Sequence, residues 1–143
     1  MSNKSTFPLS LNQIQDARKR IADAIVRTPC VPVPMISEKV GFSVYLKLEC
    51  FQITGAFKAR GNANKILLLS NEEKKRGVIT ASSGNHGQGL ALAAKRSGVS
   101  AIVVVPETAP KNKIEKIRGH GAMVIVKGET YDEASSLAHD MAE

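Results

Sequence analysis

Apolar residues in the C-terminal part of the chain form short continuous runs that alternate with helical segments. Three runs rich in Val and Ile predict β-strands at residues 78–81, 101–105 and 122–126. The segments between and after them predict helices at residues 85–96, 111–118 and from 131 to the end. The second and third runs are continuously apolar, which is typical of a sheet covered on both faces. The pattern therefore predicts an α/β fold with a parallel sheet of three to four strands flanked by helices.

The N-terminal third has a mostly helical pattern. Ser10 is suited to cap a helix over residues 11–27, in which apolar residues recur at spacings of three and four, and Thr28-Pro29 would end it. The further elements predicted before the first apolar run are a short helix at 35–40, a half-buried strand at 44–49, and helices at 57–69 and, after a cap at Ser70, at 71–76. We expect residues 1–50 to form a helical arm ahead of the α/β unit.

Composition and charge narrow the possible functions. With 143 residues, of which 43% are apolar, the chain can form one soluble domain with a core. The net charge of +7 raises the possibility of nucleic-acid binding. However, the basic residues are scattered apart from Lys111, Lys113, Lys116 and Arg118, and no aromatic residues are interleaved with that cluster. We therefore expect no nucleic-acid partner.

The cysteines and the N-terminus predict a location inside the cell. Cys30 and Cys50 have no metal-binding spacing and are typical of reduced thiols in a cytoplasmic protein. The first ten residues contain no apolar leader, and no apolar run is long enough to span a membrane. We expect no membrane contact and no metal site.

The segment "SSGNHGQG", Ser82 to Gly89, follows the first predicted strand and begins a helix. Ligands of parallel sheets bind at the carboxyl ends of the strands, and a helix N-terminus favours a carboxylate or phosphate. The glycine spacing does not fit a dinucleotide fingerprint, and neither serine has the surroundings of a hydrolase nucleophile. A simpler possibility remains open, in which a serine caps the helix while Gly84 and Gly87 permit a tight turn.

The segment "TGAFKARG", residues 54–61, places Lys58 at the predicted start of a helix. The helix dipole, the neighbouring cation Arg60 and partial desolvation against Phe57 would all favour an uncharged amine. An uncharged amine can condense with a carbonyl group. An ordinary surface lysine is the alternative.

Three segments together carry a family resemblance: "TGAFKARGNANK", "SSGNHGQGLALAAK" and "VVVPETAPKNKIEKIRGHGAMVI". They resemble fold-type II pyridoxal phosphate enzymes, in particular threonine dehydratase (threonine ammonia-lyase) and serine racemase, and the resemblance runs from about Leu11 to the end. It implies that residues 1–50 form an arm belonging to the family's large domain. Residues 51–143 would be the small domain, of the tryptophan synthase β-like type, truncated at its C-terminal end.

The resemblance also implies roles for individual residues. Lys58 would carry pyridoxal 5'-phosphate as a Schiff base and act as the base on the substrate Cα, Phe57 would pack beside the cofactor, and Asn85 would bind its phenolic oxygen. The residues implied around the carboxylate of the amino-acid substrate are Ser82, Ser83, Gly84, Asn85 and His86. The implied reaction converts L-threonine or L-serine to a 2-oxo acid and ammonia.

Two positions bear on the choice of reaction. Ala56 stands where the family usually has serine, which removes one hydroxyl near the site. Ser83 matches serine racemases, which need an acid–base group on the substrate face opposite the lysine, so racemisation stays open.

Family enzymes are more than twice as long as this chain, and the later half supplies the glycine-rich loop for the cofactor phosphate and the group facing the pyridine nitrogen. We expect the chain to correspond to the N-terminal portion, with weak cofactor binding and little turnover by itself. The alternative is an inactive module that binds a partner or a free amino acid. A homo-oligomer is expected for the full-length form by analogy.

Overall fold

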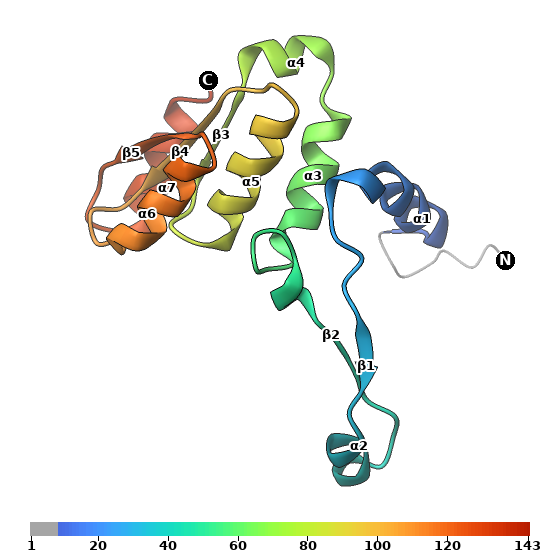
Figure 1. Cartoon of the computed structure of the whole chain (residues 1–143). Coiled ribbons are helices and arrows are strands. Elements are labelled where there is room, and N and C mark those ends of the chain that lie inside the picture. Colours follow the sequence, from blue (N-terminus) through green and yellow to red (C-terminus); the bar gives the residue numbers. More distant parts are fainter. Residues whose placement is uncertain (1–8) are drawn as a thin grey trace, which may run out of the picture.

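The sheet at the centre of the C-terminal body has three parallel strands in the order β3–β4–β5 (Figure 1). The computed structural model describes residues 9–143. Its parallel strands are β3 (Val78–Ala81), β4 (Ala101–Val105) and β5 (Met123–Val126). In register, Val78 lies opposite Ala101, and Ile102 lies opposite Met123. The predicted α/β fold class, with a parallel sheet flanked by helices, is confirmed.

Helices cover both faces of the sheet. They are α5 (Asn85–Arg96) and α6 (Lys111–Gly119) on one side, and α7 (Tyr131–Asp140) on the other, while α3 (Lys58–Leu68) packs on α5. Val103 and Val105 belong to the first core, whereas Val104 belongs to the second core with Ala134 and Ala138 of α7. All three valines are 0% exposed. Burial of each valine contributes roughly 1.5–3 kcal/mol, which explains why β4 is apolar throughout.

The helices α3 and α4 precede the sheet, and α3 lies beside α5 (Figure 1). α4 covers Asn71–Arg76. The Ser70 hydroxyl accepts a hydrogen bond from the Glu73 backbone N–H, and the Glu73 carboxylate accepts one from the Ser70 N–H. This reciprocal arrangement satisfies two backbone donors at the helix start, so the predicted cap is confirmed.

The N-terminal elements form an arm whose tip projects from the body (Figure 1). The elements are α1 (Leu11–Arg20), β1 (Cys30–Pro32), α2 (Pro34–Val40) and β2 (Tyr45–Lys47), with 3-10 turns at Ala22–Ala24 and Glu49–Phe51. β1 and β2 pair antiparallel, and α2 lies at the end of this two-stranded ribbon. Of the arm predicted at 1–50, residues 1–8 lie outside the part that the structure describes.

Several predicted boundaries in the arm were wrong. The helix expected over 11–27 ends at Arg20, because the chain turns at Ile21, which is only 6% exposed. The strand expected at 44–49 shortens to three residues, since its partner β1 pairs only over Cys30–Pro32. It is also exposed rather than half-buried, since all three of its residues are exposed. β1 was not predicted.

The last helix was also expected to continue to the end of the chain. α7 instead ends at Asp140, where the Met141 N–H bonds back to carbonyl oxygens of the last turn. The remaining helix and strand boundaries in the body lie close to their predicted positions.

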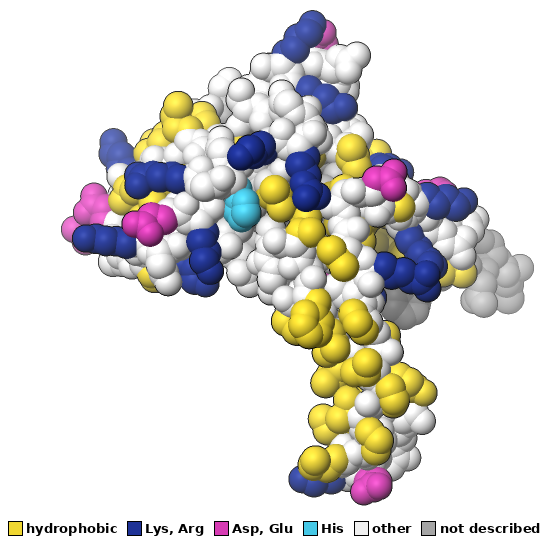
Figure 2. Space-filling model, viewed as in Figure 1, with side chains coloured by type: hydrophobic (Ala, Val, Ile, Leu, Met, Phe, Trp, Pro, Cys, Tyr) yellow, Lys and Arg dark blue, Asp and Glu magenta, His cyan; other side chains and the backbone are white. Residues whose placement is uncertain are grey.

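Exposed apolar side chains gather on the projecting arm (Figure 2). Met35 is 71% exposed, Phe42 67% and Tyr45 60%. Both cysteines are free and exposed. Among residues 9–143, no helix combines the length and apolar character needed to cross a membrane.

Candidate active site

The first turns of α3 and α5 meet beside the sheet and bring the two sequence motifs together. Lys58 begins α3, and His86 lies in the first turn of α5. Both residues line a cavity of about 430 Å³, together with Phe57 and Asn62. Lys58 therefore lines the same cavity as His86 of the "SSGNHGQG" segment.

A turn at residues 52–55 directs the chain from the arm into α3. The Gly55 N–H donates to the Gln52 carbonyl oxygen over 2.7 Å, and Gly55 has a φ of +68°. This left-handed conformation favours glycine, which explains its place ahead of the lysine. The Gln52 side chain, 4% exposed, holds the turn against the arm by bonding to both the N–H and the carbonyl of Val26.

Arg60 does not act as a free cation beside Lys58. Its Nη2 lies 2.7 Å from Oε1 of Glu49, and its Nε lies 2.8 Å from Oε2, so the pair is bidentate. The guanidinium of Arg60 lowers the pKa of Glu49 to about 2, and a hydrogen bond from Thr28 acts in the same direction. Arg60 is therefore ion-paired and is not the free neighbouring cation that we expected beside Lys58.

The Lys58 side chain is exposed at the mouth of the cavity. Its Nζ lies 5.6 Å from the centre of the Phe57 ring, a contact in which the aromatic face attracts a cation. Phe57 is itself 61% exposed. Residues 9–143 thus do not provide the desolvation of the amine that we expected, although the expected contact with Phe57 is present.

Ser82 lies just before α5, whose N-cap residue is Gly84. Its hydroxyl oxygen accepts hydrogen bonds from the backbone N–H groups of Gly84 (3.3 Å) and Gly87 (3.0 Å). The alternative in which a serine is the N-cap residue was therefore wrong in position, although the Ser82 hydroxyl does bind two N–H groups at the start of the helix. Ser83 and Gly84 are half-buried beside it, and Asn85 is exposed. The segment 82–86 therefore lies at the start of α5, and its last residue, His86, lines the same cavity as Lys58.

Gly87 is required by packing rather than by a turn. A Cβ atom at this position would lie 2.6 Å from the Ser82 carbonyl oxygen and 3.1 Å from Val103. The expectation that Gly87 permits a tight turn was wrong, because it lies inside α5 against the sheet. At Gly84 a Cβ atom would meet no atom within 4 Å, so the helix start is open.

His86 and Asn62 join the two helices. Burial lowers the pKa of His86, and the charge of Lys58 lowers it further, so the neutral imidazole is favoured. Asn62 was not among the predicted site residues, although it is 4% exposed and its Nδ2 donates to the Lys58 carbonyl oxygen over 2.9 Å. The signal that could have found it is a polar side chain within the apolar stripe of α3.

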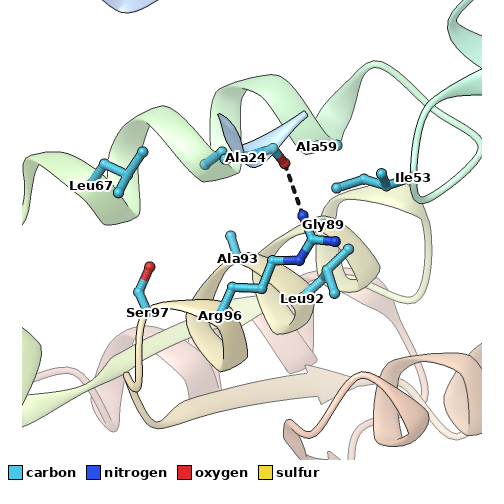
Figure 3. Close-up of a pocket in the computed structure, with 10 residues that line it drawn as sticks. Ala24, Ile53, Ala59, Leu67, Gly89, Leu92, Ala93, Arg96 and Ser97 are labelled. Atoms are coloured by element: carbon cyan, nitrogen blue, oxygen red, sulfur yellow. Dashed lines mark hydrogen bonds between the residues drawn. The ribbon is translucent and has the colours of Figure 1, made fainter. Parts of the chain in front are cut away.

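A second, small cavity lies further along the α3–α5 interface (Figure 3). It has a volume of about 30 Å³, and small side chains such as Ala59 and Ala93 line it. Arg96 of α5 donates a hydrogen bond to the carbonyl oxygen of Ala24 across it (3.1 Å). Its size suits about one water molecule, so we assign it to packing.

Comparison with known proteins identifies the family. A family model described as "Pyridoxal-phosphate dependent enzyme" matches residues 21–143. The chain is 46% identical over 130 residues to the L-threonine ammonia-lyase of Thermotoga maritima, covering 91% of this chain and 32% of that protein. It is 43% identical over 136 residues to a catabolic L-threonine dehydratase of Staphylococcus aureus, and the match covers 94% of this chain and 39% of that protein.

A solved structure gives the same result. Serine racemase from Dictyostelium discoideum superposes with a TM-score of 0.84 at 43% identity, covering 93% of this chain and 43% of that one. The chain belongs to the pyridoxal-phosphate dependent enzymes of fold type II, and pyridoxal 5'-phosphate is the cofactor of that family. The predicted family and cofactor are confirmed. The chain spans 32% and 39% of the two curated relatives.

The residues at the α3–α5 junction fit part of this cofactor. A primary amine, as in Lys58, condenses with an aldehyde. The backbone N–H groups at the open start of α5 suit an anionic group nearby. The Thr54 hydroxyl, four residues before Lys58, is buried without a hydrogen-bond partner among residues 9–143. Such a group is available to a further hydrogen-bond partner.

Proposed function

We propose that this chain carries the cofactor-attachment lysine and the carboxylate-binding segment of an ammonia-lyase acting on L-threonine or L-serine. The products would be a 2-oxo acid and ammonia. The observation that carries the proposal is the meeting of Lys58 with the start of α5 at one cavity, in a chain of this family. The threonine ammonia-lyase and dehydratase relatives support the choice of reaction.

Within this proposal, Lys58 holds the cofactor and removes the proton from the substrate Cα. When bound, pyridoxal 5'-phosphate supplies an electron-withdrawing ring that stabilises negative charge at Cα. Phe57 would pack beside the ring, and the exposed amide of Asn85 would bind its phenolic oxygen. The contact of Phe57 with Lys58 supports the first of these roles.

The segment 82–86 would hold the substrate carboxylate. The N-terminus of α5 offers backbone N–H groups and a partial positive charge. The Ser82 hydroxyl already accepts two hydrogen bonds from the start of α5, so we assign it to shaping the segment. The hydroxyl of Ser83 and the backbone around Gly84, Asn85 and His86 remain for the substrate.

Serine racemisation is the second candidate. The structural similarity to a serine racemase favours it, as does Ser83 at the start of α5. Ser83 would exchange a proton on the substrate face opposite Lys58.

We also propose that residues 1–50 belong to a large domain and that 51–143 form the small domain. The exposed apolar side chains of the arm support this division.

Incubating the chain and pyridoxal 5'-phosphate with stoichiometric L-threonine or L-serine tests the reaction. We expect 2-oxobutyrate from threonine, pyruvate from serine, and neither product from Lys58→Ala. Ser83→Ala should remove any D-serine while 2-oxo acid formation stays within a few-fold, because elimination needs only the lysine face. If no Lys58 adduct forms and the chain instead binds a partner protein or a free amino acid, the inactive binding module replaces the lyase.

A further inference from the structure

Asn62 is a polar residue in an apolar stripe. The buried face of α3 consists of Ala59, Asn62, Ala63 and Ile66, and Asn62 is 4% exposed. Burying an amide is unfavourable unless its polar atoms find partners. The partners of this side chain therefore explain why it is placed there.

The amide nitrogen of Asn62 contacts both helices of the site. It donates to the Lys58 carbonyl oxygen in its own helix over 2.9 Å. It also donates to the carbonyl oxygen of His86 in α5 over 3.3 Å and lies 3.5 Å from Nδ1 of the same residue. One NH₂ group thus links the backbone of Lys58 to His86.

Gly89 makes room for this link. A Cβ atom on Gly89 would lie 2.6 Å from Nδ2 of Asn62 and 3.2 Å from the Lys58 carbonyl oxygen. Glycine inside a helix is less stable than alanine, so its presence in α5 has a packing reason. Asn62 and Gly89 are complementary: the small residue on α5 accommodates the amide on α3.

We propose that Asn62, accommodated by Gly89, is a positioning residue that fixes the first turn of α3 against the first turn of α5. It thereby sets where Lys58 stands relative to the substrate segment, an inference whose functional side rests on the proposed role of Lys58. Asn62 acts through backbone groups and does not itself contact the reacting atoms.

The test compares the wild-type chain with Asn62→Ala and Asn62→Asp. The aspartate keeps the shape but loses the N–H donors that face two carbonyl oxygens. Asn64→Ala is the matched control, because Asn64 lies on the same helix and instead accepts a hydrogen bond from Arg20. Circular dichroism first establishes whether each variant is folded. If Asn62→Asp does not fold, Asn62→Ala alone is used to test the proposal.

Two readouts are measured. The first is the rate at which pyridoxal 5'-phosphate forms a borohydride-trapped adduct at Lys58. We expect it to fall about tenfold in Asn62→Ala and to stay at the wild-type value in Asn64→Ala, since small misplacements of a reacting group reduce rates strongly. The second is the NOE between Lys58 and Gly89, which should weaken, whereas NOEs of Ile66 to its core neighbours persist.

The outcomes separate this inference from the proposed function. If the wild type forms the adduct and Asn62→Ala forms it within twofold of that rate, the positioning role is overturned. If the wild type forms no adduct, the proposed function fails, and the Lys58–Gly89 NOE alone tests the positioning role of Asn62. A Lys58–Gly89 NOE that keeps its intensity in Asn62→Ala then rejects the inference.

Discussion

At the scale of single residues, Glu49 connects the base of the arm to α3. Its carboxylate accepts two hydrogen bonds from Arg60 and one from Thr28, and its side chain is 16% exposed. The hydrogen bonds from Arg60 hold the pKa of Glu49 at about 2, well below its usual value of 4.5. A depressed carboxyl pKa contributes stability that is present above the unfolded pKa and is lost as pH falls through the folded one.

Glu49→Gln should therefore destabilise the chain at pH 7 by about 1–2 kcal/mol, because the charge-assisted pair with Arg60 is lost and solvent partly screens that pair. The difference from the wild type should shrink as pH falls from about 4.5 toward 2. Urea unfolding of the wild type and Glu49→Gln across this pH range measures the difference in their free energies of unfolding. A difference that does not change with pH would show that the charge of Glu49 is not the source of the stability.

At the scale of elements, the glycines of α5 set how closely neighbouring parts approach. Gly87 packs on the Ser82 carbonyl and Val103, and Gly89 packs on α3. Both glycines lie within a regular helix, where glycine has no conformational advantage. Close approach of the backbone is the property that they provide.

Gly87→Ala should lower the free energy of unfolding by about 1–3 kcal/mol, because its Cβ would lie 2.6 Å from a backbone oxygen that cannot easily move. Gly119→Ala is the matched control, since a Cβ there meets no atom within 4 Å. Thermal or urea unfolding of both variants measures the effect. Equal stability of the two variants would contradict the packing role of Gly87.

The same elements show which parts of the fold can be predicted from the sequence and which cannot. The strands at 78–81 and 101–105 were predicted because their apolar runs are local signals. β1 was missed because Pro29 and Pro32 enclose only two other residues, and proline is uncommon within strands. Its partner, β2, is also separate in sequence. Asn62 and Gly89 were missed because their relation exists only once two helices, separate in sequence, have packed together.

The site was predicted through the family resemblance rather than through residue patterns alone. The reasons offered for an uncharged Lys58 were partly wrong, since Arg60 is paired with Glu49 and the lysine side chain is exposed. The proximity of Lys58 to the segment 82–86 is present nevertheless. Local sequence indicates which residues begin helices, but not which charges compensate one another.

At the scale of the whole molecule, a packed α/β body continues into an arm with an exposed apolar tip (Figures 1 and 2). Hydrogen bonds of Gln52 to Val26, and of Arg96 to Ala24, hold the base of the arm to the body. The chain spans 32% and 39% of its curated relatives. The body and the arm base thus present Lys58 at a defined place, while the tip presents apolar surface.

The central claim is that Lys58 is the amine that binds the cofactor. Borohydride reduction of the chain with pyridoxal 5'-phosphate, followed by peptide mass mapping, tests it most directly. We predict one dominant labelled peptide, modified at Lys58, which disappears in Lys58→Ala and persists in Lys65→Ala, a lysine that lines the same cavity. Label spread over many exposed lysines, unchanged in Lys58→Ala, would contradict the claim.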